Sequence, residues 1–236
     1  KSQKAAKKRR QGVLETALAL TLEPTEPDGA LEHANAALKS IPDFVPAALV
    51  AARIHINRDD ARRATSLLKR VWTATGHPDA ATLYAHAKPG SSALERLKRL
   101  QTLITDPGAS PDAAIVLARA AIDAYEWSLA RNALAPFAAN VPTRKTCLLM
   151  AEIEEGQSGD QGKARTWLSR AVTAPADPIW VADGVTSEEW APVSPATGRL
   201  DAFAWKVPVT ASAPILIETE EPAPPPAAIQ APPAAP

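Results

Sequence analysis

The feature that most constrains the fold is an apolar stripe that recurs along the chain at an interval of 34 residues. Its members are three or four residues apart, which places them on one face of an α-helix. The first matching pair of stripes is Ala30, Ala34, Ala37 and Leu38, followed by Ala64, Leu68, Val71 and Trp72. The second pair is Ala130, Leu134 and Phe137, followed by Ala164, Leu168 and Ala171, and an irregularly spaced copy lies between them at Ala93, Leu94, Leu97 and Leu100. Amphipathic helices that recur in this way predict a repeat array.

The period, the small residue that opens the second helix and the proline near its end together resemble the tetratricopeptide repeat. In that repeat the first helix carries a small residue 12 positions earlier, and the five candidate positions are Leu18, Ala52, Ala81, Ala118 and Glu152. Three of the five fit, and the tryptophan typical of the first helix is absent, so the array is degenerate. We assign repeats to residues 11–42, 45–78, 79–107, 111–142 and 143–174. The resemblance implies an all-α superhelical solenoid of helix pairs with a concave surface.

Three further segments flank this array. Residues 1–10 carry six basic side chains, and we interpret them as the end of a helix from a truncated N-terminal part. The remainder carries 20 basic and 26 acidic residues, so the chain as a whole is neutral. Residues 208–236 hold nine prolines, which predicts a disordered, partly polyproline II tail. An attraction of the basic start to anionic lipid is an alternative to a solvated helix end.

Between the array and the tail, residues 175–207 lose the helical periodicity and contain Trp180, Trp190 and Trp205. The last repeat of an array needs a cover for its apolar face, so we expect an irregular capping segment packed on the helix at 159–173. In this interpretation the three tryptophans are mostly buried. The alternative is that they are displayed as a binding site for a partner.

The same region carries a second resemblance. The stretches 148–155, 164–172, 177–184 and 190–203, with 84–97 upstream, resemble the C-terminal half of alphaproteobacterial HemY. The resemblance implies a tetratricopeptide protein that is held in the inner membrane by N-terminal helices missing here and is associated with haem biosynthesis. It implies a repeat domain on the cytoplasmic side, soluble as a fragment, and late haem-pathway enzymes as partners. It supplies no catalytic residues.

The residues themselves do not indicate an enzyme, a cofactor or a metal site. No two of the four histidines have the i, i+4 spacing that presents two ligands on one helical face. Cys147 and Met150 adjoin leucines and are expected to be buried, and Ser92 is expected to cap a helix. The chain has no Gly-x-Gly-x-x-Gly motif, and no aromatic residues interleave with the basic start, so nucleic acid is not an expected partner.

We therefore predict a non-enzymatic scaffold that binds other proteins. Arg53, Arg119 and Glu152 are candidate residues on the concave surface, with Trp180, Trp190 and Trp205 as a second candidate group. Two alternatives are an envelope-organisation adaptor that binds other membrane proteins and a carrier of haem or porphyrin. Direct haem ligation would need a histidine, cysteine or methionine in a pocket, with His55 and His86 as the residues to test.

Overall fold

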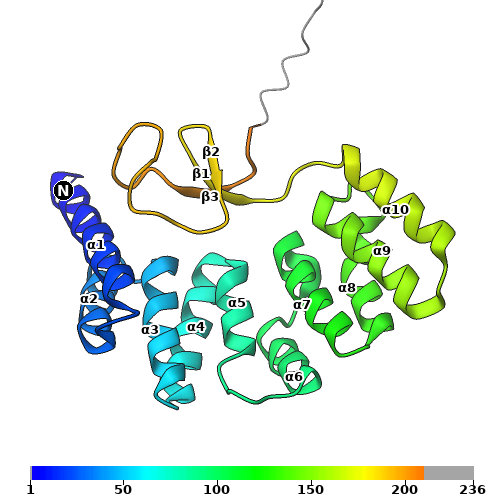
Figure 1. Ribbon diagram of the computed structural model, residues 1–236, viewed down its shortest axis with the longest axis horizontal. Helices are drawn as coiled ribbons and strands as arrows, with labels where there is room; N and C mark the ends of the chain where they lie inside the picture. The colour runs from blue at the N-terminus through cyan, green and yellow to red at the C-terminus, as the bar shows by residue number, and fades with distance from the viewer. Residues whose placement is uncertain (1, 210–236) are drawn as a thin grey trace, which may run out of the picture.

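The computed structural model describes residues 2–209, over which the chain forms ten α-helices followed by a small β-sheet (Figure 1). The helices are α1 (Ser2–Leu22), α2 (Pro27–Ser40), α3 (Val45–Asn57), α4 (Ala61–Thr75), α5 (Pro78–Ala85), α6 (Ala93–Leu103), α7 (Pro111–Asp123), α8 (Trp127–Ala138), α9 (Arg144–Ser158) and α10 (Gln161–Thr173). A short 3-10 turn, Pro107–Ala109, precedes α7. Nearly all of the tail expected to be disordered, residues 210–236, lies outside the described residues.

Consecutive helices pair and stack side by side into a curved row (Figure 1). The odd-numbered helices are the first, or A, helices of their pairs, and the even-numbered ones are the B helices. From the second pair on, the A helices begin at Val45, Pro78, Pro111 and Arg144, 33 residues apart each time. The predicted all-α solenoid of tetratricopeptide-type helix pairs is confirmed. Within the described residues, no helix is both long enough and apolar enough to cross a lipid bilayer.

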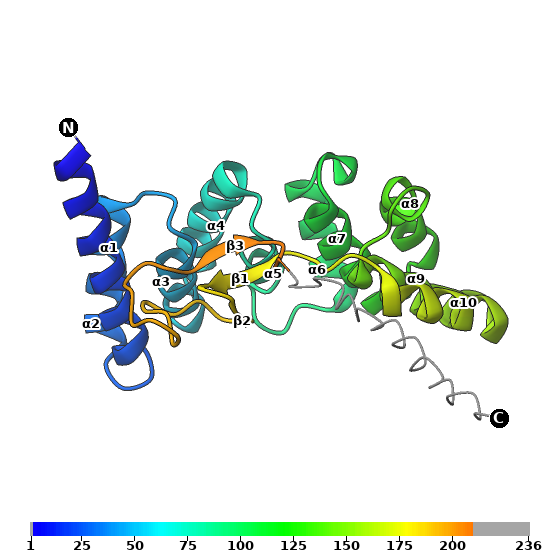
Figure 2. The same cartoon turned by 90° about the horizontal axis from the view of Figure 1, so that it is seen from above.

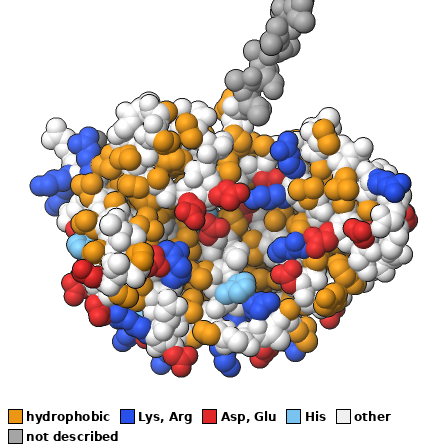
Figure 3. Space-filling model, viewed as in Figure 1, with side chains coloured by type: hydrophobic (Ala, Val, Ile, Leu, Met, Phe, Trp, Pro, Cys, Tyr) orange, Lys and Arg blue, Asp and Glu red, His pale blue; other side chains and the backbone are white. Residues whose placement is uncertain are grey.

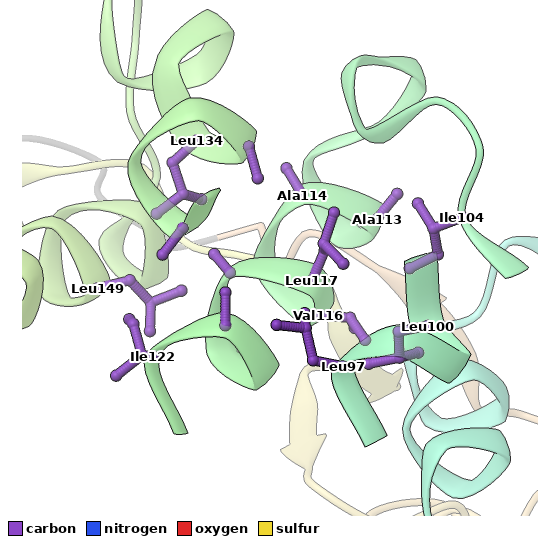
Figure 4. Packing of buried hydrophobic residues seen from close by; sticks show 14 of the residues in the cluster. Leu97, Leu100, Ile104, Ala113, Ala114, Val116, Leu117, Ile122, Leu134 and Leu149 are labelled. Atoms are coloured by element: carbon purple, nitrogen blue, oxygen red, sulfur yellow. The ribbon is translucent and has the colours of Figure 1, made fainter. Parts of the chain in front are cut away.

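Small side chains at the helix contacts allow the pairs to stack closely. Ala48 and Ala52 of α3, Ala64 of α4 and Ala80 of α5 are fully buried in one cluster with Leu68. A larger cluster surrounds α7, where leucines from four neighbouring helices fill the space between the pairs (Figure 4). Its labelled members include Leu97, Leu100, Leu117, Leu134 and Leu149. Cys147 and Met150 are buried as well, as the sequence predicts.

Two leucines assigned to the buried stripes are instead half-exposed, Leu94 at 44% and Leu168 at 47%. In α6 the residues Leu97, Leu100 and Leu103 already form the buried face, so Leu94 lies outside it. In α10 only Ala164 and Ala171 are buried, because within the described residues no further helix pair follows to cover Leu168.

Local sequence signals set the ends of the helices. Ser92 caps α6 as predicted: its hydroxyl accepts a hydrogen bond from the Glu95 amide, and the Glu95 carboxylate accepts one from the Ser92 amide. The turns from α3 to α4 and from α7 to α8 pass through Asp59 and Tyr125, with φ of 58° and 57°. An aspartate tolerates this left-handed conformation well, whereas an aromatic residue rarely adopts it.

The basic start is not a separate leader, because α1 continues through it from Ser2 to Leu22. The side chains of Lys4, Lys7, Lys8 and Arg10 are exposed. Arg9 is held by the carboxylate of Asp201, with Nη2 2.9 Å from Oδ1. This ion pair joins the first helix to a residue 192 positions later in the chain.

After α10 the chain turns back and runs along one side of the solenoid (Figures 1 and 2). This returning segment, residues 175–206, is called the strap below. It contains β1 (Ile179–Ala182), β2 (Val185–Ser187) and β3 (Ala204–Lys206), which form an antiparallel sheet in the order β2-β1-β3. In the register of the sheet, Trp180 is paired with Ser187 on one side and with Trp205 on the other.

The strap does not pack on α10, and the expected contact of its tryptophans with the last repeat was wrong. Trp180 and Trp190 are each 8% exposed, and they pack with Val13 of α1, Ala37 of α2 and Phe44 before α3, at the other end of the array. Within the described residues, the outer surface of α10 is left uncovered instead, with Leu168 and Val172 47% and 76% exposed among polar side chains. Its exposed residues include Lys163, Arg165, Thr166, Ser169 and Arg170.

Candidate protein-binding groove

The strap follows the N-terminal ends of the A helices, from the last pair back to the first. At α9 the Arg144 amide donates to the Pro175 carbonyl (2.9 Å) and the Lys145 amide to the Asp177 carboxylate (2.8 Å). At α7 the indole Nε1 of Trp205 lies 3.4 Å from the Asp112 carboxylate. Contacts to α5, α3 and α1 follow in turn, so the strap touches every helix pair.

At the start of α5 the strap encloses His77 between two indole rings. The centroid of the imidazole lies 4.2 Å from that of Trp205 and 5.2 Å from that of Trp180. Burial lowers the pKa of His77 to about 4, so the ring is neutral at physiological pH. Its Nδ1 accepts a hydrogen bond from the Asp79 amide at 3.3 Å and so caps α5.

The neutral ring then carries its proton on Nε2, which is buried and has no hydrogen-bond acceptor among the described residues. Indole faces accept N–H groups weakly, and the two rings beside His77 supply such faces. The sequence places His77 before Pro78 at a helix start, but nothing in the local pattern shows that tryptophans about 100 residues later enclose it.

Near α3 the strap is anchored by an edge-to-face contact. The ring centroids of Trp190 and Phe44 are 5.2 Å apart, with their planes at 90°. Phe44 is the N-cap residue of α3, and Phe203 and Ala47 complete the same buried cluster. The strap is therefore fixed to the solenoid by aromatic side chains at α3 and α5.

Between the strap and the A helices lie two adjoining cavities of about 430 and 550 Å³. They share Asp79, Thr82 and His86 of α5 and its C-terminal end, so together they form one groove. The floor of the larger cavity is apolar and comes from α1, α3 and α5, through Leu20, Pro46, Leu49 and Leu83. The smaller cavity lies over α6, α7 and α9, with Leu100, Ile115, Val116, Leu148 and Leu149. In Figure 3, charged side chains lie among hydrophobic ones across this face.

All six residues singled out in the sequence line this groove. Arg53, Trp180 and Trp190 line the larger cavity. Arg119, Glu152 and Trp205 line the smaller one. The two sequence-predicted groups, on the concave surface and in the tryptophan segment, thus face the same space. Their role in binding a partner stays a prediction.

Two arginines of the groove are engaged in ion pairs. Arg53 forms a bidentate ion pair with Glu23, at 2.6 and 2.7 Å. Arg119 lies 2.7 Å from the Glu152 carboxylate and 3.5 Å from that of Asp123.

Six charged groove residues were not singled out in the sequence: Asp79, Arg96, Asp123, Lys145, Glu188 and Glu189. Burial raises the pKa of Asp79, and it also raises the pKa of Asp112 beside Trp205. The positive charge of Lys145 opposes both increases in pKa. The position of Asp79 and Lys145 just inside the starts of A helices is visible in the sequence, but their approach to each other depends on the stacking of α5, α7 and α9.

The groove offers little to a metal ion, since no group of three or more potential ligands comes together in the part of the chain that is described. His86 is the histidine exposed to the groove. Its Nδ1 lies 2.9 Å from the Thr82 carbonyl, which fixes a proton on Nδ1 and leaves Nε2 for other contacts. His55, the other histidine considered for haem, is half-buried on α3 and does not line either cavity.

No protein-family model matches this chain. The chain is similar to the probable magnetosome protein Mms48 of Magnetospirillum gryphiswaldense, with 28% identity over 204 residues, which cover 84% of this chain and 45% of that protein. It therefore spans less than half the length of this relative.

Two crystal structures of MamA align with a TM-score of 0.40 each. Their sequence identities are 16% and 18%, and the alignments cover 69% and 63% of this chain and 91% and 88% of theirs. A TM-score of this size is too low to support an inference from those structures. None of these three similarities is to a HemY protein, so an association with that family stays a prediction.

Proposed function

We propose that this chain is a non-enzymatic scaffold that binds a segment of another protein in the groove between the strap and the A helices. The observation that carries the proposal is the groove itself, which has an apolar floor built from the A helices and α6 and is lined on the other side by three tryptophans of the strap. Concave surfaces of helix-pair solenoids are suited to extended partners, and large aromatic side chains provide much of the binding energy at protein interfaces.

Two processes are proposed as the setting. The sequence resemblance to HemY favours haem biosynthesis at the inner membrane, with late-pathway enzymes as partners. The printed name of the relative from Magnetospirillum favours a magnetosome-associated role. A more general proposal that includes both settings is an adaptor that binds other membrane proteins. In each case the scaffold works at a membrane surface.

Site-specific photo-crosslinking in the cell that makes the protein tests the groove. A photoreactive amino acid at Thr82, which lines both cavities, is expected to give a discrete crosslinked partner. The same amino acid at Thr73, exposed on α4 and outside both cavities, is the matched control and should give none.

The identity of the partner then distinguishes the proposed settings, because haem-pathway enzymes, magnetosome proteins and other envelope proteins are distinct sets. Equal crosslinking at both positions, or none at Thr82, would contradict binding in the groove.

A further inference from the structure

The chemistry of the groove points to one kind of occupant, and the inference rests on the function proposed above. Four cationic side chains line the two cavities: Arg53, Arg96, Arg119 and Lys145. Three of them are already held by contacts on this chain. Arg53 is held by Glu23 and Arg119 by Glu152, as described, and the guanidinium of Arg96 donates to the Ser91 carbonyl at 2.7 Å. Lys145 lies where its charge acts on Asp79 and Asp112.

Two carboxylates of the groove, in contrast, have no ion-pair partner among the described residues. Glu188 and Glu189 lie on the strap directly after β2, line the larger cavity and are exposed. Neither forms a salt bridge within residues 2–209. Asp79 also lines this cavity, and burial raises the pKa of its carboxyl group. Among the described residues that line the larger cavity, Arg53 is the one Lys or Arg, and it is paired with Glu23. The charge left without an ion-pair partner in that cavity is therefore negative and lies on Glu188 and Glu189 of the strap, which is the roof of the groove.

The same roof carries Trp180 and Trp190. Both residues are 8% exposed and their rings are already packed on other aromatic side chains, so the exposed carboxylates of Glu188 and Glu189 are the groups of the roof that attract a cation. Opposite the roof, Leu49 and Leu83 offer an apolar floor. An extended peptide directs alternate side chains to opposite sides, so one strand can place apolar side chains on the floor and cationic ones against the roof.

We propose that the groove binds an extended segment of a partner protein in which apolar residues alternate with lysine or arginine. The Pro-rich tail of this chain does not fit that description. After Lys206 the sequence contains Glu218, Glu220 and Glu221 and no lysine or arginine, so the tail would bring more negative charge to an acidic roof. Charge complementarity thus selects a cationic partner over the chain's own C-terminal residues.

Three synthetic peptides of about 10 residues, which span roughly 33 Å when extended, test this inference. Leucine alternates with lysine in the first, with glutamate in the second and with glutamine in the third. Binding to the whole chain is measured by fluorescence anisotropy of a dye on each peptide. We expect the affinity order lysine, glutamine, glutamate. We also expect the lysine peptide to weaken as added salt shortens the Debye length from about 30 Å at 0.01 M to about 3 Å at 1 M.

A variant without the two negative charges of the roof tests whether those charges attract the lysine peptide. The double variant Glu188→Gln/Glu189→Gln should bind the lysine peptide on the order of fivefold more weakly, the loss expected for two exposed ion pairs, and should leave the glutamine peptide unchanged. The matched control is Glu26→Gln/Glu32→Gln, which removes the same charge at two exposed positions outside both cavities and should change neither affinity.

The outcomes distinguish the proposal of a peptide-binding groove from the proposal that its partner is cationic. Equal or tighter binding of the glutamate peptide would overturn the cationic partner while leaving a peptide-binding groove intact. Binding of none of the peptides would count against both. Self-association of the chain that is lost in Lys7→Gln/Lys8→Gln/Arg10→Gln would assign the groove to the basic helix of a second copy, and this would overturn a separate partner.

Discussion

The position of Trp180 makes a quantitative test of how the strap is held. The side chain is 8% exposed and contacts the rings of His77 and Trp205, each with a centroid separation of 5.2–5.5 Å. Truncating a buried tryptophan to alanine costs about 3–5 kcal/mol. A chain of this size loses about 2–4 °C of melting temperature per kcal/mol, so Trp180→Ala should lower the melting temperature by on the order of 10 °C.

The control is Trp167→Ala on α10, where the indole is only half-buried beneath the guanidinium of Arg170 at 4.4 Å. Thermal unfolding followed by circular dichroism should show a clearly smaller decrease for this variant. Hydrogen exchange locates the effect: Trp180→Ala should accelerate exchange at Asp79 and Ala80, at the start of α5. An unchanged melting temperature, or faster exchange confined to α10, would refute the packing described for the strap.

Three further predictions follow from single side chains. Because the pKa of His77 is lowered to about 4 from an ordinary 6.5, the unfolded chain binds the proton first, so the free energy of unfolding should decrease as the pH falls from about 6.5 towards 4. In urea titrations His77→Phe should keep the ring stack and make the free energy of unfolding depend less on pH. An identical pH dependence in the variant and the unmodified chain would contradict this. The buried aspartates, whose pKa values are raised, change the stability in the opposite direction and do so equally in both proteins. Gly156→Ala should destabilise the chain although alanine favours helices, because its Cβ would lie 2.2 Å from the Trp127 ring, and a higher melting temperature would show that the ring moves aside easily. Added haem should give no saturable Soret shift that depends on His86, and a stoichiometric shift lost in His86→Ala would make the chain a haem carrier.

The helix pairs could be predicted from the sequence because their signal is local and periodic. The recurrence of alanine and leucine indicates the buried faces of the B helices, and prolines in the first turn of α3, α5 and α7 mark where those three pairs begin. Leu168 was assigned wrongly because periodicity shows which face of a helix is apolar but not whether a neighbour covers that face.

The sequence predicts that the strap is a separate segment, but it does not predict which helices the strap packs against. Composition shows that Trp180, Trp190 and Trp205 need burial, while the choice between α10 and the far end of the array depends on contacts between residues far apart in the sequence. The residues of the groove could likewise be predicted only in part. Arg53, Arg119 and Glu152 could be placed on A helices from the repeat register, but Glu188 and Glu189 became groove residues only through the path of the strap.

The path of the strap also changes how the molecule should unfold. In an ordinary solenoid each repeat contacts only its neighbours, so one end can fray while the other stays folded. Here the pairing of Arg9 with Asp201 and the strap contacts at α3, α5, α7 and α9 link the ends of the array to each other. Fraying of either end therefore breaks strap contacts in addition to contacts between neighbouring repeats, which raises cooperativity and makes a single transition the expected behaviour. These long-range contacts also raise the contact order, so the chain should fold more slowly than a helical array whose contacts are all local.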